Sequence, residues 1–231
     1  MTSPVSAGNW STLIERIHVI GAGRVGSAIA ARLAERGIEV TPRDPGLVLL
    51  CVPDRAIAEV ARSVETGPWL AHVSGATPLS ALDPHKRRFC VHPLQTIVLG
   101  RGPEQLDGAF AAVTAESDAA LTQGKELAEL LGMQPFELAD ADKPLYHTAA
   151  AFACGYLVTL YRIAAQLFEL AGAPPAGLIP LMARTIENGF ELTGPISRGD
   201  WSTVDAHVTA LRERAPDLEA LYLALGEATR A

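Results

Sequence analysis

The sequence predicts an α/β domain followed by an all-helical domain. Strand and helix patterns alternate through roughly the first 140 of 231 residues, which is typical of a doubly wound, largely parallel sheet. A glycine-rich segment, Gly21–Gly26, joins the first strand pattern to the first helix pattern. No strand pattern recurs after Lys143-Pro144. We therefore expect a sheet domain over residues 1–142 and a helical substrate or dimerisation domain over residues 143–231.

The individual elements follow from short apolar runs and from helical spacing. Continuous apolar runs predict buried strands at 16–20, 47–52, 69–73, 89–91 and 109–113. Helical spacing predicts helices at 27–36, 57–64 and 116–131, the first of them stopped by Gly37. The second half predicts a long helix at 146–171, a second at 178–192, and one or two more over 203–231.

Composition excludes several classes of protein. Apolar residues make up 48% of the chain and charged residues 19%, as in globular proteins. The net charge is −7, and no basic cluster exists beyond residues 86–88, which argues against nucleic-acid binding. Residues 1–13 lack the pattern of a signal peptide, and the richest apolar window, 147–170, is broken by polar and charged residues. We expect a cytoplasmic protein without a membrane span.

Cysteine and histidine spacing predicts neither disulfides nor a metal site. Cys51, Cys90 and Cys154 are odd in number and widely spaced in apolar stretches, so we expect reduced, buried thiols. The six histidines include no pair at i, i+4 and no cysteine partner at ligand spacing.

The glycine-rich segment predicts a dinucleotide site. Its six residues are Gly21, Ala22, Gly23, Arg24, Val25 and Gly26. The first glycine permits a tight turn, the second lets a pyrophosphate approach the backbone, and the third lets helix and strand pack closely. The helix start offers free N–H groups and a positive dipole to the anion. A glycine turn that binds nothing remains the alternative.

Residues 38–46 predict a truncated adenosine half of that site. Residues 38–41 could form the second strand, but only 42–46 separate them from the next strand. A parallel crossover needs a dozen or more residues, so five cannot carry the chain from the top of one strand to the bottom of another two places away. We infer that the usual second helix and third strand are missing and that 38–46 is a linking segment. Arg43 could meet a 2′-phosphate, although a solvated loop arginine explains it as well.

Polar residues follow three predicted strands. Asp54, Ser74 and His92 should converge beside the glycine segment, because ligands bind outside the carboxyl ends of the strands in such sheets. His92 is a candidate proton donor, although a buried hydrogen-bonded histidine is the simpler explanation. Ser74 could be a turn serine and Asp54 a helix cap.

Six segments in one order carry a resemblance to a known family. They are 21–26, Val52-Pro53-Asp54, His72–Ala76, His92–Thr96, Tyr146-His147, and 192–195 with Arg198-Gly199-Asp200. Together they resemble Rossmann-like proteins that carry the domain of unknown function 2520, within the 6-phosphogluconate-dehydrogenase-like group, distantly similar to pyrroline-5-carboxylate reductase and ketopantoate reductase. The resemblance covers residues from about 16 to 212. It implies a truncated Rossmann-like sheet domain followed by an all-α 6-phosphogluconate-dehydrogenase C-terminal-like domain that builds a homodimer.

The resemblance also implies residue roles. The candidate catalytic residues are His92, His147 and Tyr146, and the candidate substrate-binding residues are Ser74, Thr96, Arg198 and Asp200. NADP or NAD would be held by 21–26 together with Val52, Pro53 and Asp54. An internal Arg198–Asp200 pair that merely fixes its loop is an equal alternative. One position departs from the family: Gly155 stands where an asparagine is usual.

These observations favour an NAD(P)-dependent oxidoreductase that acts on a small keto or imino acid. Two alternatives stay open. The protein could be a non-catalytic ligand-binding module with a degenerate dinucleotide site, because the adenosine half is short and Gly155 supplies no polar donor. It could also be a structural partner whose helical half dimerises.

Overall fold

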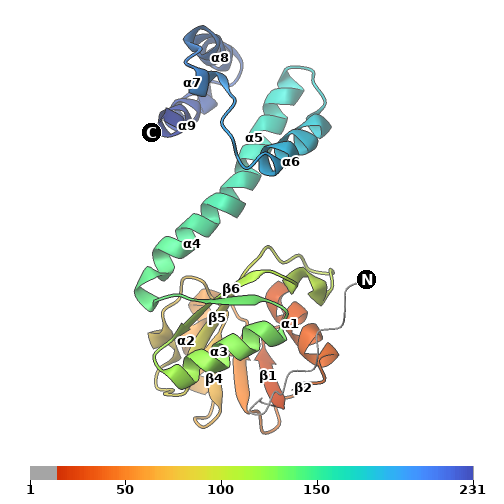
Figure 1. Ribbon diagram of the computed structural model, residues 1–231, viewed down its shortest axis with the longest axis vertical. Coiled ribbons are helices and arrows are strands. Elements are labelled where there is room, and N and C mark those ends of the chain that lie inside the picture. Colours follow the sequence, from red (N-terminus) through yellow and green to blue (C-terminus); the bar gives the residue numbers. More distant parts are fainter. Residues whose placement is uncertain (1–14, 231) are drawn as a thin grey trace. The chain divides into compact units, whose positions relative to one another are not determined.

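The computed structural model describes residues 15–230, so the segment 1–13, which bears on a signal peptide, lies outside the described part. The chain divides into two compact units, Met1–Cys154 and Gly155–Ala231 (Figure 1). We describe each unit by itself. The division falls within a helical stretch, later than the expected boundary at residue 142.

The first unit is built on one seven-stranded sheet. Its strands are β1 (Arg16–Ile20), β2 (Glu39–Val40), β3 (Leu47–Leu50), β4 (Trp69–His72), β5 (Arg88–Leu94), β6 (Phe110–Ala115) and β7 (Gln134–Glu137). The spatial order is β2-β1-β3-β4-β5-β6-β7, and every neighbouring pair is parallel except β5–β6. The predicted α/β class with a Rossmann-like sheet is confirmed.

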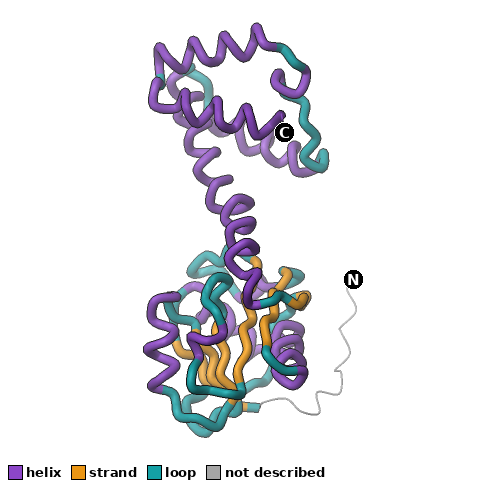
Figure 2. Tube along the Cα trace, turned by 90° about the vertical axis from the view of Figure 1, so that its left-hand side faces the viewer, coloured by secondary structure: helices purple, strands orange, loops and turns teal. Residues whose placement is uncertain are grey.

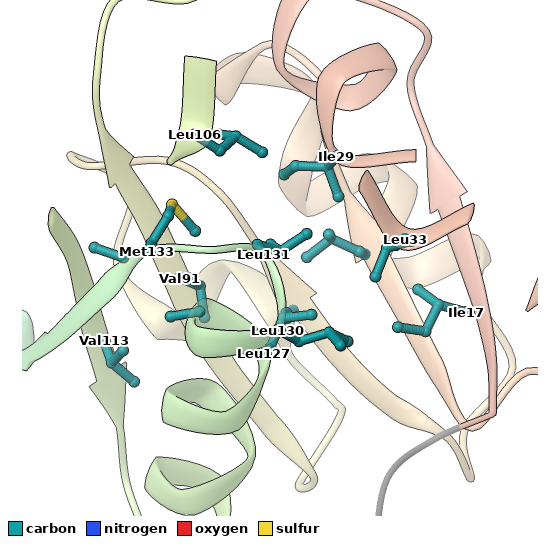
Figure 3. Packing of buried hydrophobic residues seen from close by; sticks show 14 of the residues in the cluster. Ile17, Ile29, Leu33, Val91, Leu106, Val113, Leu127, Leu130, Leu131 and Met133 are labelled. Carbon is teal, nitrogen blue, oxygen red and sulfur yellow. The ribbon is translucent and has the colours of Figure 1, made fainter. Parts of the chain in front are cut away.

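Helices cover both faces of this sheet. One face packs against α1 (Arg24–Glu35) and α3 (Asp118–Leu130) through a core that includes Ile29, Leu33 and Leu127, and Figure 3 shows this packing. The other face packs against α2 (Asp54–Ser63) and the 3₁₀ helix η1 (Leu79–Leu82). Side chains alternate between faces along a strand, so residues in β3 and β4 contribute to both cores.

The short connection between β2 and β3 has a simple geometry. β2 pairs only with Arg16 and Ile17, at the beginning of β1, and β3 pairs with the other side of β1 from Ile17 onward. The expectation that residues 42–46 could not make this connection is wrong. β2 is only two residues long and pairs with β1 only at the first two residues of β1, so the chain has a short distance to cover. The missing second helix and third strand are confirmed: no helix lies between β2 and β3.

Two features of the sheet were not predicted. The antiparallel pair β5–β6 is joined by a loop with the 3₁₀ helix η2 (Pro103–Leu106), whereas the strand–helix alternation suggested parallel strands throughout. The edge strand β7 carries Pro135 within a four-residue run. Proline is tolerated in an edge strand, where its missing N–H is not needed for a second neighbour.

Helices make up the rest of the described chain. The 3₁₀ helix η3 (Asp140–Asp142) leads into α4 (Lys143–Ala151), a π-helical turn η4 (Phe152–Tyr156) and α5 (Leu157–Leu170), where we predicted one long helix. The second unit continues with η5 (Pro175–Gly177), α6 (Leu178–Glu187), α7 (Pro195–Arg198), α8 (Trp201–Arg214), η6 (Pro216–Leu218) and α9 (Glu219–Arg230) (Figure 2).

The second unit buries few apolar side chains. Among its described residues, Leu178, Val208, Leu211 and Ala215 are the buried apolar ones. The helical stretch Asp140–Leu170 is long and apolar enough to cross a membrane by length and composition alone, and none of its most apolar window is buried in the protein. All three cysteines are free thiols, but Cys154 is exposed, contrary to the expected burial.

Candidate functional site

The glycine segment forms an open turn between β1 and α1. Gly21 has a φ of +116°, which favours glycine, and a Cβ there would lie 2.3 Å from the Cys51 carbonyl oxygen. A Cβ on Gly26 would lie 1.9 Å from the Gly21 carbonyl oxygen. These two glycines therefore let β1, α1 and β3 pack closely.

Gly23 differs from Gly21 and Gly26, because a Cβ on Gly23 would meet no atom within 4 Å. Ala22, Gly23 and Arg24 are exposed, so the turn is neither collapsed nor covered by residues 38–46. Gly23 is also the N-cap of α1, and no side chain caps that helix. The first N–H groups of α1 are thus available to an anion beside an open stretch of backbone. This cradle fits the pyrophosphate of a dinucleotide.

The adenosine side of the cradle is short. β2 ends beside Ile17, so the described residues place no strand next to the last part of β1 on that side. The turn that contains Arg43 is anchored at the opposite end of β1, where Asp44 lies 3.7 Å from Arg16. Arg43 is therefore better explained as a solvated loop arginine than as a phosphate contact.

A cluster of histidines lies at the same edge of the sheet. Ile20, Leu50, His72 and Cys90 are partners in one row across β1, β3, β4 and β5. Strands are about 4.8 Å apart, so three steps along this row place β5 about 14 Å from the glycine turn. The nicotinamide dinucleotides are long enough to span that separation from pyrophosphate to reactive ring.

His92 is the centre of this cluster. Its Nδ1 is hydrogen-bonded to the Tyr146 hydroxyl at 2.7 Å, and its ring lies edge-on to His147 at 6.0 Å between centroids. A Cβ on Gly75 would lie 2.9 Å from both His92 Nε2 and His147 Cδ2, so glycine leaves room for the two rings. The structure thus brings together the three residues that we predicted as catalytic.

Burial sets the protonation state of His92. It lowers the pKa of His92 to about 4, with smaller contributions from His147 and Lys143, while Asp54 acts in the opposite direction. Burial also raises the pKa of Tyr146 to about 12. The pair is therefore a neutral imidazole and a neutral phenol at pH 7, and one hydrogen bond can pass a proton between them.

Two residues that were not predicted as site residues complete the cluster. His72, at the end of β4, has 0% of its surface exposed, and Lys143, at the start of α4, has 1%. His72 Nε2 and Lys143 Nζ have no hydrogen-bond partner among the described residues. His72 begins one of the segments that carry the family resemblance but was not predicted as a site residue, and Lys143 precedes a proline at the expected domain boundary.

The other residues predicted in the sheet domain have simpler surroundings. The Ser74 hydroxyl accepts the N–H groups of Ala76 and Thr77 within its own turn. Thr96 lies in an exposed loop and its N–H bonds to the Gln95 side chain. Pro53 is the N-cap of α2, Asp54 is the first residue of that helix, and Val52 packs on the α2 face of the sheet.

Arg198 and Asp200 belong to the second unit. The Arg198 guanidinium donates to the Thr193 carbonyl, and the Asp200 carboxylate caps α8 by accepting from Thr203 and Ser202. Arg198 and Asp200 therefore each stabilise their own part of the loop. Neither an Arg198–Asp200 ion pair nor a ligand contact is needed to explain why the two residues are present.

No group of three or more histidine, cysteine, aspartate or glutamate side chains that could hold a metal ion occurs within residues 15–230.

The neutral histidines predict a pH dependence of stability. Burial lowers the pKa of His72 to about 3, and both His72 and His92 stay neutral where an unfolded histidine, with a pKa of about 6.5, takes up a proton. The unfolded state then binds more protons, so the free energy of unfolding falls as the pH drops from about 6.5 towards 4. We expect a loss of about 2 kcal/mol between pH 6 and pH 5.

Urea unfolding at pH 7, 6 and 5 measures this loss. His72→Asn, whose amide oxygen can still accept the Ser74 N–H, should remove about half of the dependence. His207→Asn, at an exposed position, should leave it unchanged. Equal slopes in the wild-type protein and both variants would show that the His72 ring is not held neutral.

Comparison with known proteins gives the family and the fold. Residues 109–229, just over half of the chain, match the family described as "Domain of unknown function (DUF2520)". No curated protein matches the chain. Among solved structures, the "putative NADP oxidoreductase BF3122" from Bacteroides fragilis is 21% identical with a TM-score of 0.77, over 92% of this chain and 96% of that one.

Two further structures share this fold. Protein TM1727 from Thermotoga maritima is 24% identical with a TM-score of 0.75, over 93% of this chain and 96% of that one. The 1-pyrroline-5-carboxylate reductase of Streptococcus pyogenes is 14% identical with a TM-score of 0.61, over 94% and 96% of the two chains. The predicted resemblance to the DUF2520 family is confirmed: the chain belongs to that family, and it has a Rossmann-like sheet domain.

Proposed function

We propose that the protein is an NAD(P)-dependent oxidoreductase that reduces a small keto or imino acid. The observation that carries the proposal is the placement of an open glycine turn and a neutral histidine cluster at one edge of one sheet. Structures with the same fold are named as a putative NADP oxidoreductase, a 1-pyrroline-5-carboxylate reductase and a reductive aminase in complex with NADPH, which supports the same class.

The glycine turn would hold the phosphates. Gly23 leaves the approach open, α1 supplies N–H groups, and the exposed Arg24 adds a positive charge. Val52 and Pro53 follow β3, so they lie on the path from this turn towards His92. The chemistry that a reduced nicotinamide dinucleotide supplies when bound is hydride transfer to a carbonyl or imine carbon.

His92 would supply the proton. Reduction of a carbonyl needs one hydride at carbon and one proton at oxygen, and reduction of an imine needs them at carbon and nitrogen. His92 Nε2 lies beside Gly75, on the other side of the ring from Nδ1, which is bonded to Tyr146. A neutral ring that gives its Nε2 proton to the substrate can recover one at Nδ1 from the phenol, and the partly exposed phenol regains its own proton from water. Tyr146 thus serves as the second member of a proton relay.

The proposed reaction is tested by following the absorbance of NADPH and NADH with a panel of 2-keto acids and cyclic imino acids. Turnover with at least one acid, lost in the His92→Asn variant, supports the proposal. Tight dinucleotide binding without turnover on any acid would favour the second candidate.

The second candidate is a non-catalytic module that binds a ligand through the same cradle. Two observations favour it: β2 is only two residues long, and Gly155 offers no polar side chain where the family usually has asparagine. A Cβ on Gly155 would meet no atom within 4 Å, so Gly155→Asn should fold normally. If Gly155→Asn turns over a substrate and the unchanged protein does not, this chain has lost the ancestral activity.

We further propose that the protein works as a cytoplasmic homodimer whose partners are small molecules, not nucleic acid or membranes. The second unit leaves several large apolar side chains more than half exposed: Ile179, Leu181, Ile186, Phe190 and Leu192. Obligate dimers cover such surfaces with the same surface of a second copy.

Light scattering after gel filtration tests the dimer. We expect a mass of twice 24.4 kDa for the chain. Leu181→Arg, in the exposed apolar set, should shift the protein to monomer or to aggregate, whereas Glu213→Arg, which places the same charge at an exposed polar position, should leave the mass unchanged. A monomeric wild-type chain, or a chain that partitions into detergent or vesicles, would contradict this proposal.

A further inference from the structure

Lys143 is a buried ammonium with almost no compensation. Its nearest carboxylate oxygen, Asp140 Oδ1, lies 3.9 Å from Nζ. Both oxygens of Asp140 already accept the Leu79 N–H, at 3.1 Å each. A lysine has three N–H donors, and burying them without acceptors is costly.

His72 is a second buried donor. Its Nδ1 accepts the Ser74 N–H at 3.1 Å, so the neutral ring must carry its proton on Nε2. That Nε2–H is completely buried and has no acceptor among the described residues. Burial lowers the pKa of His72 to about 3, and the charge of Lys143 lowers it further.

The neighbouring thiol does not supply the missing acceptor charge. Cys90 lies opposite His72 in the β4–β5 register, and its Sγ donates to the Ser74 carbonyl at 3.3 Å. Burial raises the pKa of Cys90 to about 11, so the group is a neutral thiol at pH 7. Lys143 lowers the pKa of this thiol through its charge and a weak hydrogen bond, but a neutral thiol cannot balance an ammonium. The cluster thus holds two buried donors, Lys143 Nζ and His72 Nε2, with no carboxylate oxygen of the described residues within hydrogen-bond distance of either.

We propose that Lys143 Nζ and His72 Nε2 bind the carboxylate of the substrate. This inference rests on the proposed function and names the group that the site recognises. A carboxylate carries the full negative charge that the ammonium lacks, and its two oxygens can accept from both donors. Because both donors are closed to solvent, the acid must be small. His72 lies opposite Cys90, two residues before His92 in the adjoining strand, so a carbonyl beside the bound acid group would lie on the side of the proton donor.

The three lysines of the chain, Lys86, Lys125 and Lys143, make a direct test possible. Labelling lysine with ¹⁵N and ¹³C gives three side-chain signals that Lys→Met variants assign. In the full chain with NADP⁺ present, we expect pyruvate to shift the Lys143 signal saturably and to leave the other two unchanged. Pyruvamide, the neutral analogue, should bind at least tenfold more weakly.

Lys143→Met supplies the second readout. Methionine fills the same space without the charge, so pyruvate binding should weaken at least tenfold while the melting temperature stays equal or rises. Lys125→Met, which removes an exposed pair with Glu137, should bind pyruvate normally. His72→Asn should weaken binding as well, because it removes the Nε2 donor.

Three results would overturn the inference. The Lys143 signal could fail to respond to pyruvate, which would mean that a bound water alone satisfies the donors. The variant could melt lower and still bind pyruvate, which would make Lys143 structural. Pyruvamide could bind as tightly as pyruvate. If NADP⁺ binds and Lys143 does not respond, only this inference fails; if Lys143 responds and NADP⁺ does not bind, the proposed function fails and the acid site stands.

Discussion

Replacing Gly23 with valine should weaken the binding of NADPH and NADH at least a hundredfold and leave the fold intact. Gly23 has a φ of −75° and a ψ of −170°, which valine adopts without strain, and a Cβ there meets nothing in the protein. The added methyl groups would fill the space reserved for the pyrophosphate. A hundredfold loss corresponds to about 2.7 kcal/mol of binding free energy.

Two other glycines serve as controls for that result. Gly26→Ala would place a Cβ 1.9 Å from backbone, so it should lower stability by about 1–3 kcal/mol whether or not a ligand binds. Gly177→Val, at the start of α6 with open space around it, should change neither property. Calorimetric titration and thermal unfolding of the three variants separate the two roles of the motif. A Gly23→Val protein that binds dinucleotide normally would remove the turn from the site.

Replacing His92 with asparagine should lower turnover by about 10²–10⁴-fold and leave dinucleotide affinity unchanged. The shorter amide can keep a hydrogen bond to Tyr146 but cannot reach the position of Nε2. Tyr146→Phe should cost less, since it removes the relay and keeps the donor. Steady-state kinetics with the acid that turns over fastest measures both effects.

The second unit contains a matched control for this pair. His207 Nδ1 lies 2.7 Å from the Tyr222 hydroxyl, with the rings edge-on as in the His92–Tyr146 pair. His207→Asn should leave turnover unchanged, because that pair belongs to none of the predicted sites. Equal losses in the His92 and His207 variants would mean that both act through folding.

The fold class and the glycine turn of the site could be predicted from the sequence. The apolar run 16–20, the glycines and the following helix depend on local spacing, and they lie where predicted. The antiparallel direction of β6 relative to β5 could not be predicted, because no local sequence pattern in the connecting loop indicates it. The shortness of β2 could not be predicted, because it depends on where the chain passes from one side of β1 to the other and not on the residues of β2 themselves.

The cluster shows the same limit. His92, Tyr146 and His147 could be predicted, since all three lie in segments that carry the family resemblance, although His92 lies within β5 and does not follow it. His72 begins another of these segments, but its role and that of Lys143 could not be predicted, because their buried donors become visible only when β4, β5 and α4 are brought together. A buried lysine looks in sequence like any lysine before a proline.

Calorimetric titration of the full chain with NADPH, NADH and ADP tests the central claim most directly. We expect micromolar dissociation constants for at least one of the two reduced dinucleotides, about −8 kcal/mol, despite the short β2. Binding should disappear in Gly23→Val and persist in Gly177→Val. No heat with any of the three ligands at millimolar concentration would contradict the account, and the glycine turn would then be a packing device alone.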